Sequence, residues 1–207
     1  MTEQYVDTPV GRARLDWFPA HGTHRATVLL GHGTATGVEA ADLQALARAL
    51  PDAGTAVVLM TQPYRIERNR GVSDEPSLDA AWAAVWPQVS GSAPLVVSGG
   101  RSAGSQVACR TAAALDADAV LILAYPLRGP GSPGELLSVG KRALIVQGGA
   151  DPFGRPAEFP ALPPNMQLIE IPSANHMFTS TADRNPAATL AMVTSAAVNW
   201  IEGLGSP

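Results

Sequence analysis

Residues 95–107 read LVVSGGRSAGSQV, and this stretch joins a predicted strand to a predicted helix. Leu95 to Val97 are typical of a strand, whereas the alanine-rich residues 105–115 favour a helix. Between them, Gly100-Arg101-Ser102-Ala103-Gly104 fits the pattern G-x-S-x-G. A serine at such a bend either caps the helix or is exposed as a nucleophile. The segments before and after it decide between these two interpretations.

Strand-like and helix-like runs alternate along the rest of the chain. Strands are expected at residues 26–30, 56–60, 119–123, 143–146 and 167–171, and helices at 43–50, 78–89 and 187–200. Continuous apolar strands that alternate with helices predict a mostly parallel sheet covered on both faces. Residues 4–7 and 12–18, on either side of a Pro-Val-Gly turn, predict a hairpin at an antiparallel edge. We expect a single domain over residues 1–207.

The composition argues against several classes of protein. The chain of 207 residues is 46% hydrophobic and 15% charged, as is typical of a globular domain. Its net charge of −4 and the absence of a basic patch argue against a nucleic-acid partner. Cys109 is the only cysteine, so no internal disulfide can form. Without a signal-like or membrane-spanning apolar run, the expectation is a cytoplasmic protein with no membrane span.

Two residues after the motif favour a nucleophilic serine. A serine hydroxyl needs a base that takes its proton, and the base needs a third group that orients it. His176 is the only histidine after Ser102, and Asp151 lies between them; each follows a predicted strand. The chain order Ser, Asp, His is that of a nucleophile-elbow enzyme. We predict a triad of Ser102, Asp151 and His176, with Glu135 and Glu158 as alternative acids.

An oxyanion hole would need two backbone N–H groups near the serine. One is expected from Ala103, the residue after the nucleophile, and the other from the loop after an early strand. The sequence LLGHGTATG at residues 29–37 supplies that loop, with Thr34 as the predicted donor and Ala35 as the alternative. His32 lies too early in the chain order to be the base, and we interpret it as a residue that shapes the loop.

Five segments together resemble an α/β-hydrolase over nearly the whole chain. They are LLGHGTATG, SGGRSAGS, AYPLRGPGSP, VQGGADPFG and SANHMF. The likeness is greatest to the small dienelactone-hydrolase-like branch, which includes bacterial relatives of the NSL-complex-subunit-3 and testis-expressed-protein hydrolase-like family. The resemblance implies a three-layer α/β-hydrolase fold and the Ser102–Asp151–His176 triad. Some eukaryotic members of this branch serve as components of assemblies.

The expected activity is serine hydrolysis of carboxylic ester or thioester bonds in small to medium substrates, without a metal or organic cofactor. Residues 125–141 are too few for a helical cap domain, so an open, shallow site is expected. Apolar residues near the strand ends are predicted to line it. They are Tyr64, Leu127, Phe153, Met177 and Phe178.

Other hypotheses stay open at this point. The fold could serve a non-catalytic binding or assembly protein, or the same triad could act as a peptidase or an acyltransferase. Arg101, beside the nucleophile, is expected either to meet an anionic substrate group or to form a weak surface ion pair. The partner is predicted to be a small-molecule ester or thioester, and the protein a monomer or homodimer.

Overall fold

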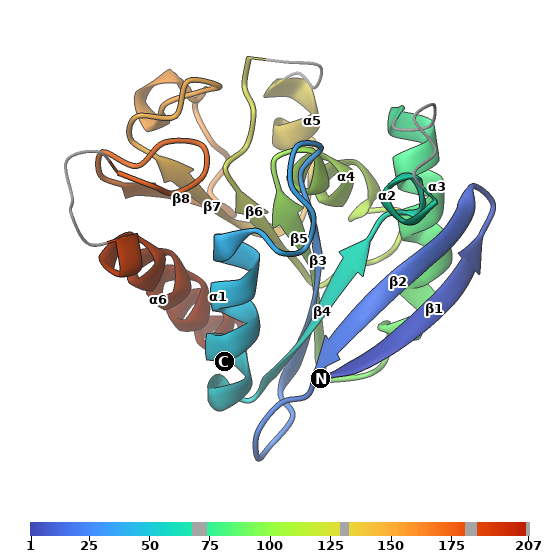
Figure 1. The fold of residues 1–207 in the computed structure, drawn as a ribbon. Coiled ribbons are helices and arrows are strands. Elements are labelled where there is room, and N and C mark those ends of the chain that lie inside the picture. The colour runs from blue at the N-terminus through green and yellow to red at the C-terminus, as the bar shows by residue number, and fades with distance from the viewer. Residues whose placement is uncertain (68–73, 129–132, 181–185, 206–207) are drawn as a thin grey trace.

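The computed structural model describes residues 1–67, 74–128, 133–180 and 186–205, and its centre is an eight-stranded sheet (Figure 1). The strand order across the sheet is β1-β2-β4-β3-β5-β6-β7-β8. The strands are β1 (Thr2–Thr8), β2 (Gly11–Phe18), β3 (Ala26–Gly31), β4 (Thr55–Thr61), β5 (Leu95–Arg101), β6 (Ala119–Leu123), β7 (Arg142–Gly148) and β8 (Met166–Ile171).

The sheet is parallel except at one edge. The hairpin β1–β2 is antiparallel, and β2 also runs antiparallel to β4. The remaining pairs, from β4–β3 to β7–β8, are all parallel. Every residue of β3, β4 and β6 is buried, which explains their unbroken apolar runs. The predicted mostly parallel sheet with an antiparallel edge is confirmed.

Helices cover both faces of the sheet, so the molecule has three layers (Figure 1). One core contains Trp82 and Val107 and lies under α3 and α4; the other contains Leu46 and Ala197 and lies under α1 and α6. The helices are α1 (Ala41–Ala49), α2 (Pro63–Ile66), α3 (Glu75–Val85), α4 (Ala103–Thr111), α5 (Pro133–Leu137) and α6 (Pro186–Leu204), with 3₁₀ turns at Leu50–Ala53, Trp86–Gln88 and Pro156–Glu158.

The strand that leads to the serine is longer than the sequence predicts. β5 continues through Gly99, Gly100 and Arg101, because β3 and β6 pair with it on both sides. Pairing on two sides compensates for the weak strand propensity of glycine. Ser102 therefore lies at the carboxyl end of a central strand, where parallel α/β sheets carry their sites.

The described residues of the connection between β6 and β7 form no cap domain. Among its described residues, the only regular element is α5, which has five residues. In the described part of the chain, no helix has both the length and the apolar character of a membrane span. The carboxyl ends of the strands are thus left accessible above Ser102.

Candidate active site

Ser102 lies at the sharp turn between β5 and α4. Its backbone has φ 51° and ψ −121°, which is unusual for a residue with a side chain. Its N–H donates to the Leu123 carbonyl of β6 at 3.0 Å, which ties the turn to the sheet. Although Ser102 occupies the N-cap position of α4, its side chain makes no capping hydrogen bond. The hydroxyl is therefore available for other contacts.

The glycines that flank this turn allow backbone segments to approach closely. A Cβ atom at Gly100 would lie 2.6 Å from the Gly104 carbonyl carbon, and one at Gly104 would lie 2.5 Å from Gly31 backbone atoms. Backbone atoms cannot move aside as a flexible side chain can. A side chain at either position would therefore push α4 away from β3 and β5.

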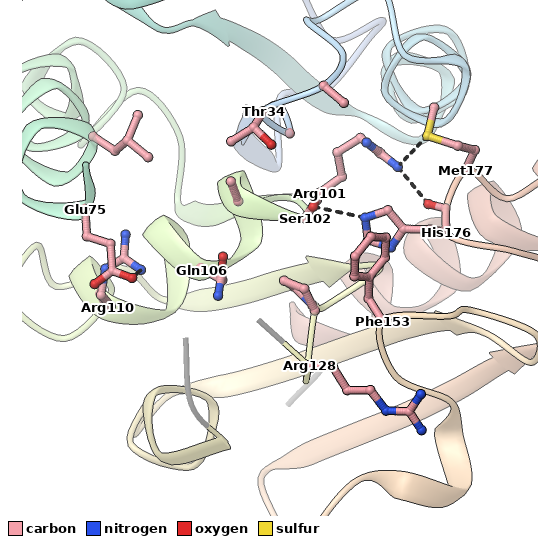
Figure 2. Close-up of a pocket in the computed structure, with 15 residues that line it drawn as sticks. Thr34, Glu75, Arg101, Ser102, Gln106, Arg110, Arg128, Phe153, His176 and Met177 are labelled. Carbon is pink, nitrogen blue, oxygen red and sulfur yellow. Dashed lines mark hydrogen bonds and ion pairs between the residues drawn. The ribbon is translucent and has the colours of Figure 1, made fainter. Parts of the chain in front are cut away.

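The structure brings the three predicted triad residues together (Figure 2). The Ser102 hydroxyl lies 3.0 Å from His176 Nε2, and His176 Nδ1 lies 2.8 Å from Asp151 Oδ2. With the proton on Nδ1, His176 donates to Asp151 and accepts from Ser102. The His176 side chain is 15% exposed and the Asp151 side chain 0%. The base can thus contact a substrate, while the acid is shielded from water.

Asp151 is held by a residue that the sequence analysis did not single out. Gln147, fully buried in β7, donates from Nε2 to Asp151 Oδ2 at 3.0 Å and to the Gly154 carbonyl at 2.7 Å. Its Oε1 accepts from the Tyr125 N–H at 2.8 Å. The other Asp151 oxygen accepts from the Phe153 N–H at 2.8 Å. A polar residue at the end of an apolar strand, four positions before the acid, was the signal for this role.

Arg101 differs from both sequence-based expectations, because its side chain is only 1% exposed and is fully engaged within the protein. Its Nε donates to Asp42 Oδ2 at 3.0 Å, and its Nη1 donates to Thr36 Oγ1 at 3.1 Å. Its Nη2 lies 2.7 Å from the His176 carbonyl oxygen and 3.3 Å from Met177 Sδ. The guanidinium is therefore neither a surface group nor free to bind an anion.

The loop after β3 lies directly against the nucleophile. A Cβ atom at Gly33 would be 3.0 Å from Arg101 Nη1 and 3.2 Å from Ser102 Cβ, so glycine permits this approach. Thr34, the predicted oxyanion donor, is exposed and lines the pocket beside Ala103. Ala103 is the first residue of α4, where backbone N–H groups have no partner within the helix.

His32 shapes this loop, as the sequence suggested. Its Nδ1 donates to the Gly33 carbonyl at 2.7 Å, and its Nε2 accepts from the Gln62 N–H at 3.1 Å. Burial lowers the pKa of His32, so the imidazole remains neutral and both contacts are kept.

A cavity of about 330 Å³ opens beside Ser102 and His176. Figure 2 shows His176 and Met177 at one end, Glu75 and Arg110 at the other, and Gln106 between them. The lining combines the loops after the strands with the faces of α3 and α4. It consists of Gly33, Thr34, Ala35, Glu75, Leu78, Arg101, Ser102, Ala103, Gln106, Arg110, Pro126, Arg128, Phe153, His176 and Met177.

Only two of the five predicted lining residues reach this cavity. Phe153 and Met177 line it and are partly exposed, and the Phe153 ring lies 4.7 Å from the His176 ring. Phe178 is 1% exposed and belongs to the core under α6. Tyr64 and Leu127 pack against the opposite core and are not among the lining residues. Proximity in sequence to a strand end did not reveal which way these side chains point.

All three arginines that line the cavity are paired with carboxylates. Arg101 binds Asp42, as described above, and Arg128 binds Glu158. Arg110 makes a two-pronged contact with Asp79 at 2.8 and 2.9 Å and also lies 3.4 Å from Glu135 and 4.0 Å from Glu75. Among the described residues, no arginine of the cavity wall is unpaired, and three carboxylates (Glu75, Asp79 and Glu135) surround Arg110.

Two other groups with chemical potential lie outside this arrangement. Cys109 is fully buried in α4, and burial raises the pKa of its thiol well above its usual range. The thiol therefore stays protonated and acts as a small apolar side chain. Among the described residues, no group of three or more His, Cys, Asp or Glu side chains could hold a metal ion.

The elbow, its glycines and the order of the strands define an α/β-hydrolase. Residues 24–202 match the model of an alpha/beta hydrolase domain family, and the chain belongs to this family. A search of curated proteins finds no match to the sequence.

Solved structures show the same fold at low sequence identity. A lidless α/β serine hydrolase, XC6422 from Xanthomonas campestris, has 20% identity and a TM-score of 0.77, with 100% of this chain and 96% of that chain covered. Dienelactone hydrolase from Anabaena variabilis has 21% identity and a TM-score of 0.74, with 98% and 97% covered. A thermophilic esterase from Thermogutta terrifontis has 16% identity and a TM-score of 0.74, with 100% of both chains covered.

These comparisons confirm the predicted fold class and the likeness to the dienelactone-hydrolase-like branch. The narrower relationship to the NSL-complex-subunit-3 family stays a prediction.

Proposed function

We propose that the protein is a serine hydrolase that cleaves carboxylic ester or thioester bonds in small to medium substrates. The observation that carries the proposal is the continuous hydrogen-bonded series from Ser102 through His176 to buried Asp151. Two further observations support it. The Ser102 side chain makes no capping hydrogen bond with α4, and a cavity lies beside it. The family match and the esterase and dienelactone hydrolase among the structural neighbours agree with this reaction class.

The first step of the proposed reaction forms an acyl-enzyme. His176 Nε2 takes the proton of the Ser102 hydroxyl while the oxygen attacks the substrate carbonyl carbon. The charge that develops on the carbonyl oxygen is stabilised by the N–H groups of Ala103 and of Thr34 in the adjacent loop. The bond to the leaving group breaks, and the alcohol or thiol departs with the proton that His176 returns.

The second step releases the acid. His176 takes a proton from a water molecule while the water oxygen attacks the acyl-enzyme carbonyl carbon. The bond from this carbon to Ser102 Oγ then breaks, the acid leaves, and His176 returns the proton to Ser102. Asp151 keeps the imidazole in one tautomer and stabilises its protonated form in both steps. In both steps, His176 is the group that accepts the proton and then returns it.

The lining of the cavity favours a substrate with an uncharged arm, by which we mean that the part of the substrate against the cavity wall carries no charge. Apolar groups of Leu78, Ala103, Pro126 and Phe153 form much of the wall. Among the described lining residues, a carboxylate on the substrate would meet only arginines that are already paired, together with Glu75. Such a carboxylate would lose its hydration without gaining a partner, which is unfavourable.

A fluorophosphonate probe tests the proposal directly, because it phosphonylates an activated serine and releases fluoride. Intact mass measurement of the native protein is expected to show one adduct, and Ser102→Ala and His176→Ala are expected to show none. An ester and thioester series of graded acyl length would then define the substrate range. A folded native protein without any adduct would contradict hydrolysis and favour a binding or assembly role.

A further inference from the structure

Arg101 is the residue that connects the nucleophile to the two loops around it. It is the last residue of β5 and directly precedes Ser102. Figure 2 shows its side chain extending from the elbow toward Met177 and the His176 backbone. Because the side chain is 1% exposed, these contacts are shielded from competing water.

The contacts of Arg101 reach both loops on which the proposed chemistry depends. Nη2 binds the His176 carbonyl at 2.7 Å, on the residue that carries the base. Nη1 binds Thr36 Oγ1 at 3.1 Å, two positions after the predicted oxyanion donor Thr34. One rigid guanidinium thus sets the distance between the loop of the base and the loop of the oxyanion hole.

Asp42 fixes the orientation of this guanidinium. It lies in the first turn of α1, its side chain is 2% exposed, and it accepts from Arg101 Nε at 3.0 Å. With Nε held there, both terminal nitrogens point toward the loops. Burying such a pair brings little net stability, because both charges lose their hydration. Its placement between the loops is better explained by positioning.

We infer that Arg101 is a positioning residue for the hydrolysis, and that it acts by holding the His176 backbone and the oxyanion loop in register with Ser102. The inference rests on the proposed function. The Ser102–His176 hydrogen bond is 3.0 Å long, and a misplacement of about 1 Å can cost roughly 100-fold in rate. Lysine cannot replace arginine here, because its single ammonium cannot reproduce the planar fork that reaches Asp42 and both loops.

The test uses Arg101→Lys, with Arg14→Lys as the matched control. Arg14 lies in β2, away from the cavity, and pairs with Asp16 at 3.1 Å, so the control also alters an arginine–carboxylate pair. The expected result for Arg101→Lys is a kcat lowered by roughly 10- to 100-fold with KM within about threefold. The rate of fluorophosphonate labelling is expected to fall by a similar factor.

A spectroscopic signal separates positioning from general instability. The proton between His176 Nδ1 and Asp151 Oδ2 is expected to give a low-field resonance in proton NMR, apart from the amide region. In folded Arg101→Lys this resonance is expected to shift or broaden, and in Arg14→Lys to match the native protein. A folded Arg101→Lys with native kcat and an unchanged resonance would overturn the inference, as would an equal kcat loss in Arg14→Lys.

A milder variant keeps the inference testable if Arg101→Lys does not fold. Thr36→Val is nearly isosteric and removes only the acceptor for Nη1. Its kcat is expected to fall by about two- to fivefold with KM unchanged, whereas a native kcat would contradict a role for the oxyanion-loop contact. If the native protein takes no fluorophosphonate, the proposed function and this inference fail together. Labelling that is indifferent to both substitutions overturns this inference alone.

Discussion

The two ends of the cavity are built in different ways. At the triad end, Asp151, Gln147 and Arg101 are at most 1% exposed, and each makes several hydrogen bonds within the protein. At the α3–α4 end, the Glu75 side chain is 47% exposed and that of Arg110 is 15% exposed. In the proposed function, the reacting groups are thus held where water cannot compete, whereas the part of the wall that would contact the rest of the substrate is more exposed.

The difference predicts how substitutions divide between the two ends. Changes at the triad end should lower kcat or stability, because they disturb a preorganised polar network. Changes at the α3–α4 end should alter the choice of substrate by smaller factors, because exposed charges are screened by solvent.

The largest effect is expected from Asp151→Asn. The amide cannot hold the His176 tautomer that accepts the serine proton, so kcat is expected to fall by roughly 10⁴-fold with little change in KM. Steady-state kinetics on an activated ester measures this. Glu158→Gln removes the alternative acid of the sequence analysis and should cost no more than a few-fold. A larger loss in Glu158→Gln than in Asp151→Asn would reassign the acid.

The second largest effect is expected from a substitution of Gln147, which holds Asp151 in place. Gln147→Leu leaves the Tyr125 N–H and the Gly154 carbonyl buried without their partner, so the free energy of unfolding should fall by about 3 kcal/mol. Urea unfolding followed by circular dichroism measures it. Gln167→Leu, on an exposed position of β8, should stay within about 0.5 kcal/mol. Equal losses in both variants would contradict the role of Gln147.

The sequence predicted the parts of the site that follow from local rules. The chain order of Ser102, Asp151 and His176 and their positions after strands were enough to bring them together, because parallel strands end at one edge. Arg101 was misread for the opposite reason. Its partner Asp42 lies 59 positions away in sequence, and no local pattern showed that α1 would bring this carboxylate to it.

The same limit applies to the fold and to the cavity wall. Apolar runs located the strands, but the extension of β5 through two glycines depends on pairing with β3 and β6. Phe178 and Met177 are adjacent in sequence, yet the first is in the core and the second lines the cavity. Such alternation depends on loop geometry that residue types alone do not encode.

At the α3–α4 end, the expected effect is on selectivity. Among matched 4-nitrophenyl esters, an uncharged acyl chain is expected to give a kcat/KM about tenfold higher than a chain of equal length that ends in a carboxylate. Glu75→Gln should narrow this ratio, because it removes an acidic group near Arg110. The ratio should also shrink as ionic strength rises. A preference for the carboxylate ester would contradict the uncharged-arm proposal.

The smallest effect concerns the pH dependence of stability. Burial lowers the pKa of His32 in the folded protein below its ordinary value of 6.5, so the unfolded chain binds more protons at acid pH. The contribution of His32 to the free energy of unfolding is therefore present above about pH 6.5 and is lost as the pH falls. Between pH 7 and pH 5, His32→Gln should therefore lose less stability than the native protein, as measured by urea unfolding at each pH. A native-like curve for His32→Gln would contradict this assignment.

The hairpin β1–β2 also affects the tendency of the protein to aggregate with other copies of itself. It lies before residue 24, where the family match begins, and β2 pairs along β4, a strand buried at every position. Without the hairpin, β4 would present a row of free N–H and C=O groups on a largely apolar strand. Such a strand is a template for intermolecular pairing. The hairpin thus covers a strand edge that would otherwise favour aggregation through strand pairing.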